Sequence, residues 1–427
     1  MKRRTFLNAL AGVCVSNVLP MSLTPAFGAT PDRFLITITA AGGWDPTAFV
    51  DPKGSALRAD GRGPINNYSA SDIRSAGNLI YAAYPSSVLP VASDSPGHMD
   101  NFFAKHYQRL LVINGVDAQT TSHVSGSRFM WSGRIEEGFP SVGALVAAPY
   151  AGQPMAYIST GGYDYTASLV SPVKTATPAT FAALAYPNSQ YADSVKNRKL
   201  SYFNDSAYSA VQAARDARLA RLQSSESLPK RLEQMQQLEL ARSSDEQLQS
   251  LLANLPATVS ASVKGQAEVA VAAFASGLAA SANMYVDGFD THAGNDTRQA
   301  QSLTILFECI DHLWTQIEKA GLQNKVTILI GSDFGRTPFY NTAGGKDHWN
   351  VTTVMAMGAG ITGNRVIGAT SANFDALKIN PSTLETHSEG IFITPKHIHR
   401  ALRDFIGVSP ELDRQFPIVA EPLALFI

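Results

Sequence analysis

Carboxylate and imidazole side chains recur in this sequence in short polar loops, each of which follows or precedes an apolar run. The six side chains are Asp45, Asp290, His292, Asp333, Asp347 and His348. Carboxylate and imidazole together form a ligand set that zinc or manganese accepts, provided that separate segments hold them close together. A single loop aspartate is usually a turn former or a helix cap. Because four distant loops end in such residues in a chain with only 9 His, we interpret them as candidates for one shared metal site.

Short β-rich apolar runs are expected to position these loops as strands. The runs cover residues 34–40, 110–116, 282–286, 325–331 and 352–357, and helical segments are expected at residues 97–108, 124–133, 264–280, 296–320 and 395–406. Strands that alternate with helices indicate an α/β fold with a mainly parallel sheet. In such sheets the binding crevice lies at the carboxyl ends of the strands. We therefore expect the candidate residues to meet at that edge.

Residues 205–255 differ in composition from the rest of the chain. They are rich in Ala, Leu, Gln, Arg and Glu, and their apolar residues recur at mixed three- and four-residue spacing. This pattern predicts two amphipathic helices that are broken near Pro229, within an insert at about residues 190–258. The inserted hairpin is expected either to cap the sheet edge or to mediate contact with another subunit or a partner.

The first 29 residues have the pattern of an export signal. Lys2, Arg3 and Arg4 precede a mostly apolar stretch, and small residues at 26–29 suit cleavage after Ala29. The paired arginines resemble a twin-arginine signal, which implies contact with that export machinery; an ordinary Sec signal is the alternative. We therefore expect a periplasmic or secreted protein, with residues 30–427 as its α/β domain.

The composition excludes several classes of protein. Lys and Arg total 34 against 35 Asp and Glu, with 45% hydrophobic and 16% charged residues, which excludes a polybasic nucleic-acid binder, a disordered acidic chain and a collagen-like chain. No stretch after the signal has the length of a membrane span. Cys309 is the one thiol after residue 29 and lies in an apolar helical run, so we expect it to be buried and inert.

Several motifs resemble, in order along the chain, the bacterial exported proteins grouped as domain-of-unknown-function family 1501. The motifs are Gly42-Gly43-Trp44-Asp45, Ser122-His123, Asp290-Thr291-His292, Asp333-Phe334-Gly335-Arg336-Thr337-Pro338 and Gly344-Gly345-Lys346-Asp347-His348-Trp349. That family looks similar to the alkaline phosphatase and sulfatase superfamily. The resemblance implies an alkaline-phosphatase-like three-layer α/β sandwich with a mainly parallel central sheet. It also implies metal-dependent hydrolysis of phosphate or sulfate esters.

The resemblance further implies a role for each matched residue. The implied metal ligands are Asp45, Asp290, His292, Asp333 and His348, holding one or two ions of zinc, manganese or calcium. The nucleophile is expected among Thr120, Thr121 and Ser122, ahead of a helix that begins near Val124. His123 is left open as a ligand, a base or a helix cap. Arg336 and Arg128 are each candidates to clamp a tetrahedral anion, with a salt bridge to a neighbouring carboxylate as the alternative.

Two functional hypotheses follow from these residues. The first is an exported metal-dependent hydrolase of a small-molecule or polysaccharide ester. The second is a catalytically inactive exported binding or assembly protein on the same fold, in which the hairpin at 205–255 is the contact surface. Its motivation is Phe334, which stands where the superfamily usually has a second ligand histidine.

Overall fold

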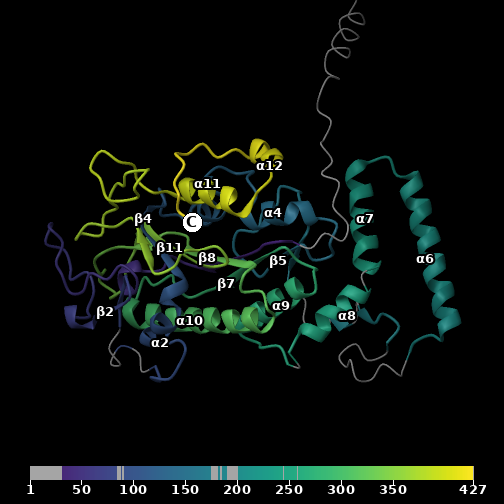
Figure 1. Ribbon diagram of the computed structural model, residues 1–427, viewed down its shortest axis with the longest axis horizontal. Coiled ribbons are helices and arrows are strands. Elements are labelled where there is room, and N and C mark those ends of the chain that lie inside the picture. Colours follow the sequence, from purple (N-terminus) through teal and green to yellow (C-terminus); the bar gives the residue numbers. More distant parts are fainter. Residues whose placement is uncertain are drawn as a thin grey trace, which may run out of the picture.

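An eight-stranded sheet forms the centre of the computed structural model (Figure 1). The structure describes residues 31–83, 88, 91–174, 181–182, 185–189, 201–243, 245–256 and 258–426, so the predicted export signal lies outside the described residues. Across the sheet the strands are β12 (Arg365–Ile367), β4 (Leu110–Asp117), β11 (Val351–Gly358), β8 (Val326–Ser332), β1 (Phe34–Ala40), β7 (Ser281–Val286), β5 (Tyr157–Ser159) and β6 (Pro172–Lys174).

The sheet is mainly parallel, as the sequence predicts. Strand β11 runs antiparallel to both of its neighbours, β4 and β8, and the other neighbouring pairs are parallel. The carboxyl ends of β1, β4, β7 and β8 therefore lie at one edge of the sheet, together with the amino end of β11. All the loops that carry candidate ligands leave or enter the sheet at this edge.

Helices cover both faces of the sheet and make three layers (Figure 1). Strand β1 shows how its alternating side chains serve both faces. Phe34 joins a core with helices α2 (Met99–His106), α9 (Val263–Ala275) and α10 (Asn295–Lys319), and its ring stacks on Phe274 with centroids 4.6 Å apart. Leu35 joins the opposite core with α3 (His123–Ser132), α4 (Val142–Ala147) and α11 (Pro395–Ile406). The predicted three-layer α/β sandwich is confirmed.

Two short ribbons and a small helix complete the described core domain. Strands β2 (Ile73–Ala76) and β3 (Leu79–Ala82) pair as one ribbon, and β9 (Gly335–Arg336) pairs with β10 (His348–Trp349) as the other. Helix α12 (Pro410–Gln415) follows α11. In the second ribbon His348 pairs with Arg336, so a candidate ligand lies beside the strand that follows β8.

Residues 201–256 form helices α6 (Asp205–Ser225), α7 (Pro229–Ser243) and α8 (Asp245–Asn254). The predicted break near Pro229 coincides with the start of α7. Figure 1 shows α6 and α7 beside each other at one end of the molecule, and no residue of α6 is buried. Helix α8 contributes Leu248 and Leu251 to the core that contains α9. The hairpin is thus attached through α8, while α6 faces solvent.

Two sequence expectations concern burial and membranes. The Cys309 side chain is fully buried, and this burial raises the pKa of its thiol to about 12, which keeps it protonated and unreactive. Among the helices that the structure describes, none combines the length and the apolar composition of a membrane span.

Candidate metal centre

Three histidines and one aspartate meet at the carboxyl edge of the sheet. Asp290 and His292 follow β7, His123 is the first residue of α3, and His348 lies on β10. Ligand atoms of His123, Asp290 and His348 all lie within 4.8 Å of one another. The Nε2 atom of His292 is 3.2 Å from Asp290 Oδ1 and 2.9 Å from Nε2 of His348. Four side chains from three separate segments therefore present ligand atoms to a common point.

The second ring nitrogen of each histidine faces an atom that can only accept a hydrogen bond at neutral pH. His123 Nδ1 is 2.8 Å from Asp333 Oδ2, His292 Nδ1 is 2.8 Å from Asp347 Oδ1, and His348 Nδ1 is 2.7 Å from the backbone oxygen of Thr121. Each Nδ1 must therefore carry the proton and donate it. In a ring that carries no second proton, the Nε2 atom is then left with its lone pair facing the centre.

This protonation pattern makes the contact between His292 and His348 informative. Two nitrogen lone pairs 2.9 Å apart repel each other unless a proton or a metal cation lies between them. Two nitrogen ligands of one tetrahedral zinc ion, each about 2.0–2.1 Å from the metal, are separated by about 3.3 Å, so a small opening of this contact would admit the ion. Donation of the other ring nitrogen to a carboxylate or backbone oxygen is also the usual arrangement of histidine ligands. The residues present therefore fit a divalent metal ion.

A buried arginine fixes the aspartate. Arg336 is fully buried, and its guanidinium donates to the backbone oxygens of Gly43 (2.8 Å), Lys346 (3.0 Å) and Gly42, and to Asp290 Oδ1 at 2.6 Å. The Asp290 side chain itself is half exposed. Arg336 thus donates these hydrogen bonds inside the protein, where it orients the carboxylate of Asp290 that faces the three histidines.

Electrostatics in the cluster favours ionised carboxylates. Burial by itself would raise the pKa of Asp290, but the hydrogen bond and charge of Arg336, with smaller effects of His123 and His292, lower it overall. The hydrogen bond from His292 lowers the pKa of Asp347. The hydrogen bond to Asp333 raises the pKa of His123, whereas burial lowers the pKa of His348. A cation at the centre would therefore meet the negative charge of Asp290. Asp347 carries a second negative charge on the far side of the His292 ring.

Close backbone packing holds the ligand segments together at two glycines. A Cβ atom on Gly345 would collide with the backbone carbonyl of His292, and one on Gly126 in α3 would collide with the backbone oxygen of Asp333. The loop before β10 therefore approaches the His292 segment, and α3 approaches the end of β8, more closely than a larger residue allows.

A family model described as "Protein of unknown function (DUF1501)" matches residues 32–397. The chain belongs to this family. The family resemblance expected from the motifs is thereby confirmed. No curated protein matched the sequence.

Solved structures with similarity to this DUF1501 chain include hydrolases of phosphate, phosphonate and sulfate esters. A phosphonate monoester hydrolase of Agrobacterium radiobacter is 11% identical, with 89% of this chain and 74% of that chain covered and a TM-score of 0.34. The alkaline phosphatase of the Antarctic bacterium TAB5 is 9% identical (79% and 95% covered, TM-score 0.32), and a 2-O GAG sulfatase is 9% identical (89% and 71%, TM-score 0.33).

The predicted ligands of this DUF1501 protein divide into three groups. Asp290, His292 and His348 are brought together. Asp333 lies behind His123, as the acceptor for its Nδ1. Asp45 is not brought into the cluster, because its carboxylate is fully buried and bonded to Lys346 Nζ at 2.6 Å. The sequence predicts that Asp45 lies in the loop after a strand, but it could not show that a lysine 301 positions away would reach it.

The residues expected to act on substrate are also placed by the structure. His123, left open in the sequence, points its Nε2 toward Asp290 Oδ2 at 3.7 Å. Thr121 and Ser122 directly precede it and are exposed, and Ser122 is the N-cap of α3. Thr120 Oγ1 accepts a hydrogen bond from the Ser122 N–H. Arg128 instead bonds Ile135 and Glu137, the salt-bridge alternative noted for it.

Phe334 stands at the position where the resemblance led us to look for a further ligand histidine. Its fully buried ring lies against two ligand rings, with centroids 4.8 Å from His123 and 4.5 Å from His348. This apolar ring packs against the two histidines and offers no ligand atom. Within the described residues, the histidines of the cluster therefore form a single group of candidate ligands.

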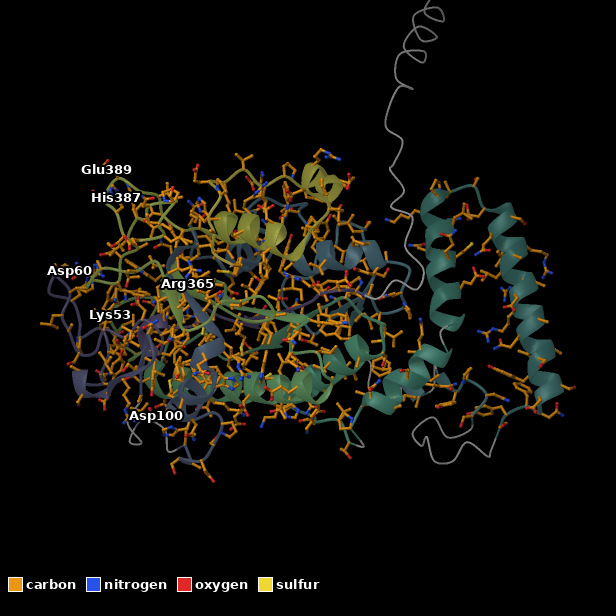
Figure 2. The ribbon with its side chains drawn as sticks, in the orientation of Figure 1. Lys53, Asp60, Asp100, Arg365, His387 and Glu389 are labelled. Atoms are coloured by element: carbon orange, nitrogen blue, oxygen red, sulfur yellow. The ribbon has the colours of Figure 1, made fainter. Side chains whose placement is uncertain are left out.

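Two long loops lie near each other at one end of the molecule. Figure 2 shows Asp60 on one and His387 and Glu389 on the other. The loops touch through Asn373, whose Oδ1 accepts from the N–H of Ala59 at 2.8 Å. Trp349, the residue after His348, donates to the oxygen of Phe374 at 3.3 Å and so joins the second loop to β10.

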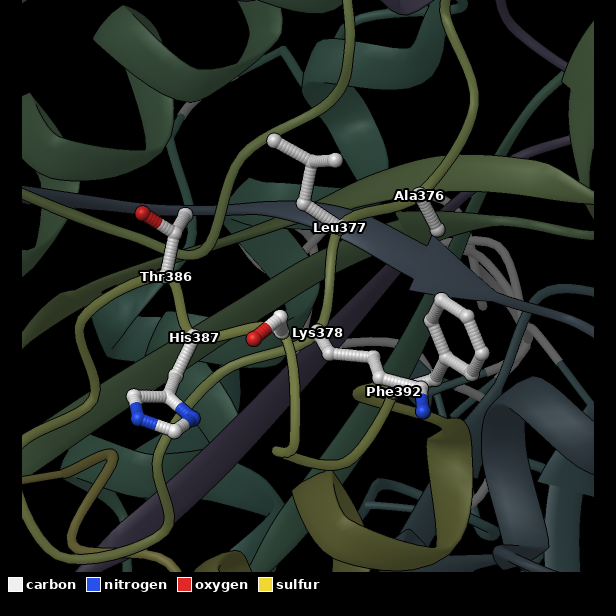
Figure 3. Close-up of a pocket in the computed structure, with 7 residues that line it drawn as sticks. Ala376, Leu377, Lys378, Thr386, His387 and Phe392 are labelled. Atoms are coloured by element: carbon white, nitrogen blue, oxygen red, sulfur yellow. The ribbon is translucent and has the colours of Figure 1, made fainter.

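An open cavity of about 360 Å³ lies in the second loop (Figure 3). It is lined by Ala376, Leu377, Lys378, Thr386, His387, Ser388 and Phe392. None of these residues belongs to the histidine cluster. The cavity is therefore a separate feature of the loop that borders the centre.

Proposed function

We propose that this protein binds one divalent metal ion through His123, His292, His348 and Asp290. The observation that carries the proposal is the 2.9 Å separation of the Nε2 atoms of His292 and His348, while each Nδ1 donates to a separate acceptor. The half-exposed side chains of Asp290 and His292 leave the centre open to a ligand from solvent.

We propose further that the centre hydrolyses phosphate or sulfate esters. Helix α3 begins at His123, and no side chain caps its N-terminus, so its first N–H groups are available to an anion beside the cluster. When bound, the metal ion supplies positive charge that polarises an ester oxygen and activates an oxygen nucleophile. A tetrahedral anion held between the helix end and the cluster thus meets two sources of positive potential.

Ser122 is the residue best placed to act as nucleophile. It is exposed at the N-cap, and no hydrogen bond to its hydroxyl is found among the described residues, whereas the hydroxyl of Thr120 accepts from Ser122 N–H. In the proposed step the Ser122 oxygen forms a bond to phosphorus or sulfur while the ester bond to the leaving oxygen breaks. The proton of the Ser122 hydroxyl passes through water to the leaving oxygen, which departs as the alcohol. A second water molecule then hydrolyses the serine ester, which releases phosphate or sulfate and restores the hydroxyl.

Arg336 has a supporting part in this proposal. Its guanidinium is fully buried, and its hydrogen bonds go to three backbone oxygens and Asp290. It is therefore a positioning residue, which holds Asp290, and not a clamp for the substrate.

The test combines metal analysis with turnover. Mature protein purified without chelator should contain about one equivalent of zinc, manganese or calcium and should hydrolyse an aryl phosphate or an aryl sulfate. Asp290→Asn should lower both metal content and turnover, whereas Ser122→Ala should lower turnover alone. His387→Gln, a change of an exposed histidine outside the cluster, is the matched control and should alter neither. Protein that binds no metal under these conditions would contradict the proposal.

Metal binding without turnover on either ester would favour the second function, an inactive binding or assembly protein. The specific feature that supports such a role is α6, whose 21 residues include none that is buried. In that case deletion of residues 205–243 should abolish association with a second copy or a partner while metal content is unchanged.

Export is part of the proposal and rests on the first 29 residues. Replacement of Arg3 and Arg4 by lysine should retain the protein in the cytoplasm if the twin-arginine route is used. Unchanged export of this variant would point to the Sec route instead.

A further inference from the structure

A lysine and an aspartate form a fully buried ion pair next to the histidine cluster. Lys346 Nζ lies 2.6 Å from Asp45 Oδ2, and both side chains have an exposed fraction of 0%. Neither charge is expected in a protein interior without a partner, because removing either from water is costly. Neighbouring groups must therefore stabilise both charges in the interior.

Neighbouring residues form hydrogen bonds with both the carboxylate and the ammonium group. Asp45 Oδ1 accepts from the N–H of Thr47 at 3.1 Å and from its hydroxyl at 2.6 Å, and Oδ2 accepts from Asn295 Nδ2 at 3.2 Å as well as from the lysine. Lys346 Nζ also donates to Thr47 Oγ1 at 3.2 Å and lies 5.2 Å from the centre of the Tyr340 ring. The carboxylate thus has four donors, and one of them is a full positive charge.

The pair is connected to the cluster through the backbone of the same lysine. The Lys346 oxygen accepts from Arg336, which holds Asp290, and the Lys346 N–H donates to the oxygen of Thr291, between Asp290 and His292. The next two residues are Asp347 and His348, which support and complete the cluster. Lys346 therefore lies at the junction between Asp45 and the proposed metal ligands.

We propose that the ammonium group of Lys346 is a permanent cation at Asp45, and that it takes the position a second metal ion would need to use this carboxylate. The inference rests on the proposed metal site at the histidines and specifies its stoichiometry. The chain binds a single divalent ion, because the Asp45 carboxylate in the loop after β1 is already neutralised by the charge of Lys346.

The test removes the tethered charge and asks whether an ion replaces it. In Lys346→Ala, Asp45 keeps its charge and the space of the lysine side chain becomes available. After equilibrium dialysis against manganese or magnesium, metal analysis should give one equivalent for the wild type and two for this variant. Thermal unfolding of the variant should shift to higher temperature with added metal, beyond any shift of the wild type.

The matched control is the double variant Asp45→Asn with Lys346→Met, which removes both charges together. It should bind one equivalent and should lose the additional metal-dependent stabilisation. If Lys346→Ala does not fold without metal, its recovery on refolding with manganese supports the inference, and failure to recover with any divalent metal contradicts it.

Wild-type stoichiometry separates this inference from the proposed function. Native mass spectrometry that shows two ions in the wild type, with one lost in Asp45→Asn, would overturn the role of Lys346 and leave the metal site intact. A wild type with no metal would instead overturn the metal site itself. A Lys346→Ala variant that folds, binds one ion and is not stabilised by metal would also overturn the inference.

Discussion

His292 and Asp347 are joined by a 2.8 Å hydrogen bond from Nδ1 to Oδ1, and this bond turns the opposite ring nitrogen of His292 toward His348. The same carboxylate oxygen accepts from Asn341 Nδ2 at 3.0 Å. Asp347 is therefore held from two sides, and it fixes both the ring orientation and the protonation state of a proposed ligand.

Replacement of Asp347 by Asn should weaken metal binding without unfolding the protein. An amide at this position no longer stabilises the Nδ1–H form of His292, and loss of such a partner typically costs about 10–100-fold in metal affinity. Competition with a chromogenic chelator measures the affinity. Asp375→Asn, at an exposed position on the neighbouring loop, is the control; equal affinities of the two variants would refute the role of Asp347.

Arg336→Lys should destabilise the fold strongly. A lysine cannot reproduce a planar group that bonds three backbone oxygens and Asp290, so we expect a loss of about 3 kcal/mol or more in the free energy of unfolding. Arg128→Lys, whose partner Glu137 is exposed, should cost less than about 1 kcal/mol. Urea denaturation compares the two variants, and similar losses in the free energy of unfolding would contradict this structural role of Arg336.

Gly345→Ala should disturb the cluster, and Gly344→Ala should disturb it far less. A Cβ on Gly345 collides with the carbonyl of His292, whereas a Cβ on Gly344 meets nothing within 4 Å. Gly344 has a φ of 63°, so alanine there is strained by about 1 kcal/mol but leaves the ligand segment in place. Metal content should therefore fall in the first variant and persist in the second.

Stability should fall in acid partly because of His399. Burial lowers the pKa of His399 to about 3, while an unfolded histidine titrates near about 6.5. Between these values the unfolded chain binds a proton that the folded chain does not, so the contribution to stability is complete above the unfolded pKa and is lost as pH falls. The loss should reach about 2 kcal/mol by about pH 5.

The measurement is the urea midpoint as a function of pH. His399→Gln keeps a donor for the oxygen of Met130, which accepts from His399 Nε2 at 2.8 Å, but cannot titrate. Its midpoint should vary less with pH than that of the wild type. His106, whose pKa burial lowers to about 4, should give a residual slope of the same sign in both proteins.

Most of the fold could be predicted from local patterns. The run at residues 34–40 is β1, and the run at 325–331 is shifted by one residue in β8, because buried strands of a parallel sheet are continuous apolar segments with clear ends. The direction of β11 could not be read in this way, since periodicity does not report orientation. The second of the two helices predicted within residues 205–255 is described as α7 and α8, and Leu248 and Leu251 of α8 join the core.

The candidate site was predictable as an edge of the sheet but not as a set of contacts. Asp290, His292 and His348 meet because the carboxyl end of β7 and the amino end of β11 lie at the same edge of the sheet. The pairing of Asp45 with Lys346, and of His123 with Asp333, depends on how side chains are directed once the layers pack. From the sequence alone, two carboxylates that each follow a parallel strand look the same. Only their contacts in the fold show which one is a candidate metal ligand and which one forms an ion pair.

The hydrogen bond from His348 to the backbone oxygen of Thr121 has a mechanical consequence. The carbonyl that steadies this ring belongs to the peptide unit that leads into Ser122. A shift of that peptide, caused by an incoming ester or by a change in the chain around residue 121, would pull on the imidazole at the same moment as it moves the serine. If the proposed ion and the proposed serine nucleophile are both present, we therefore expect a change at residue 121 to alter metal affinity and turnover together.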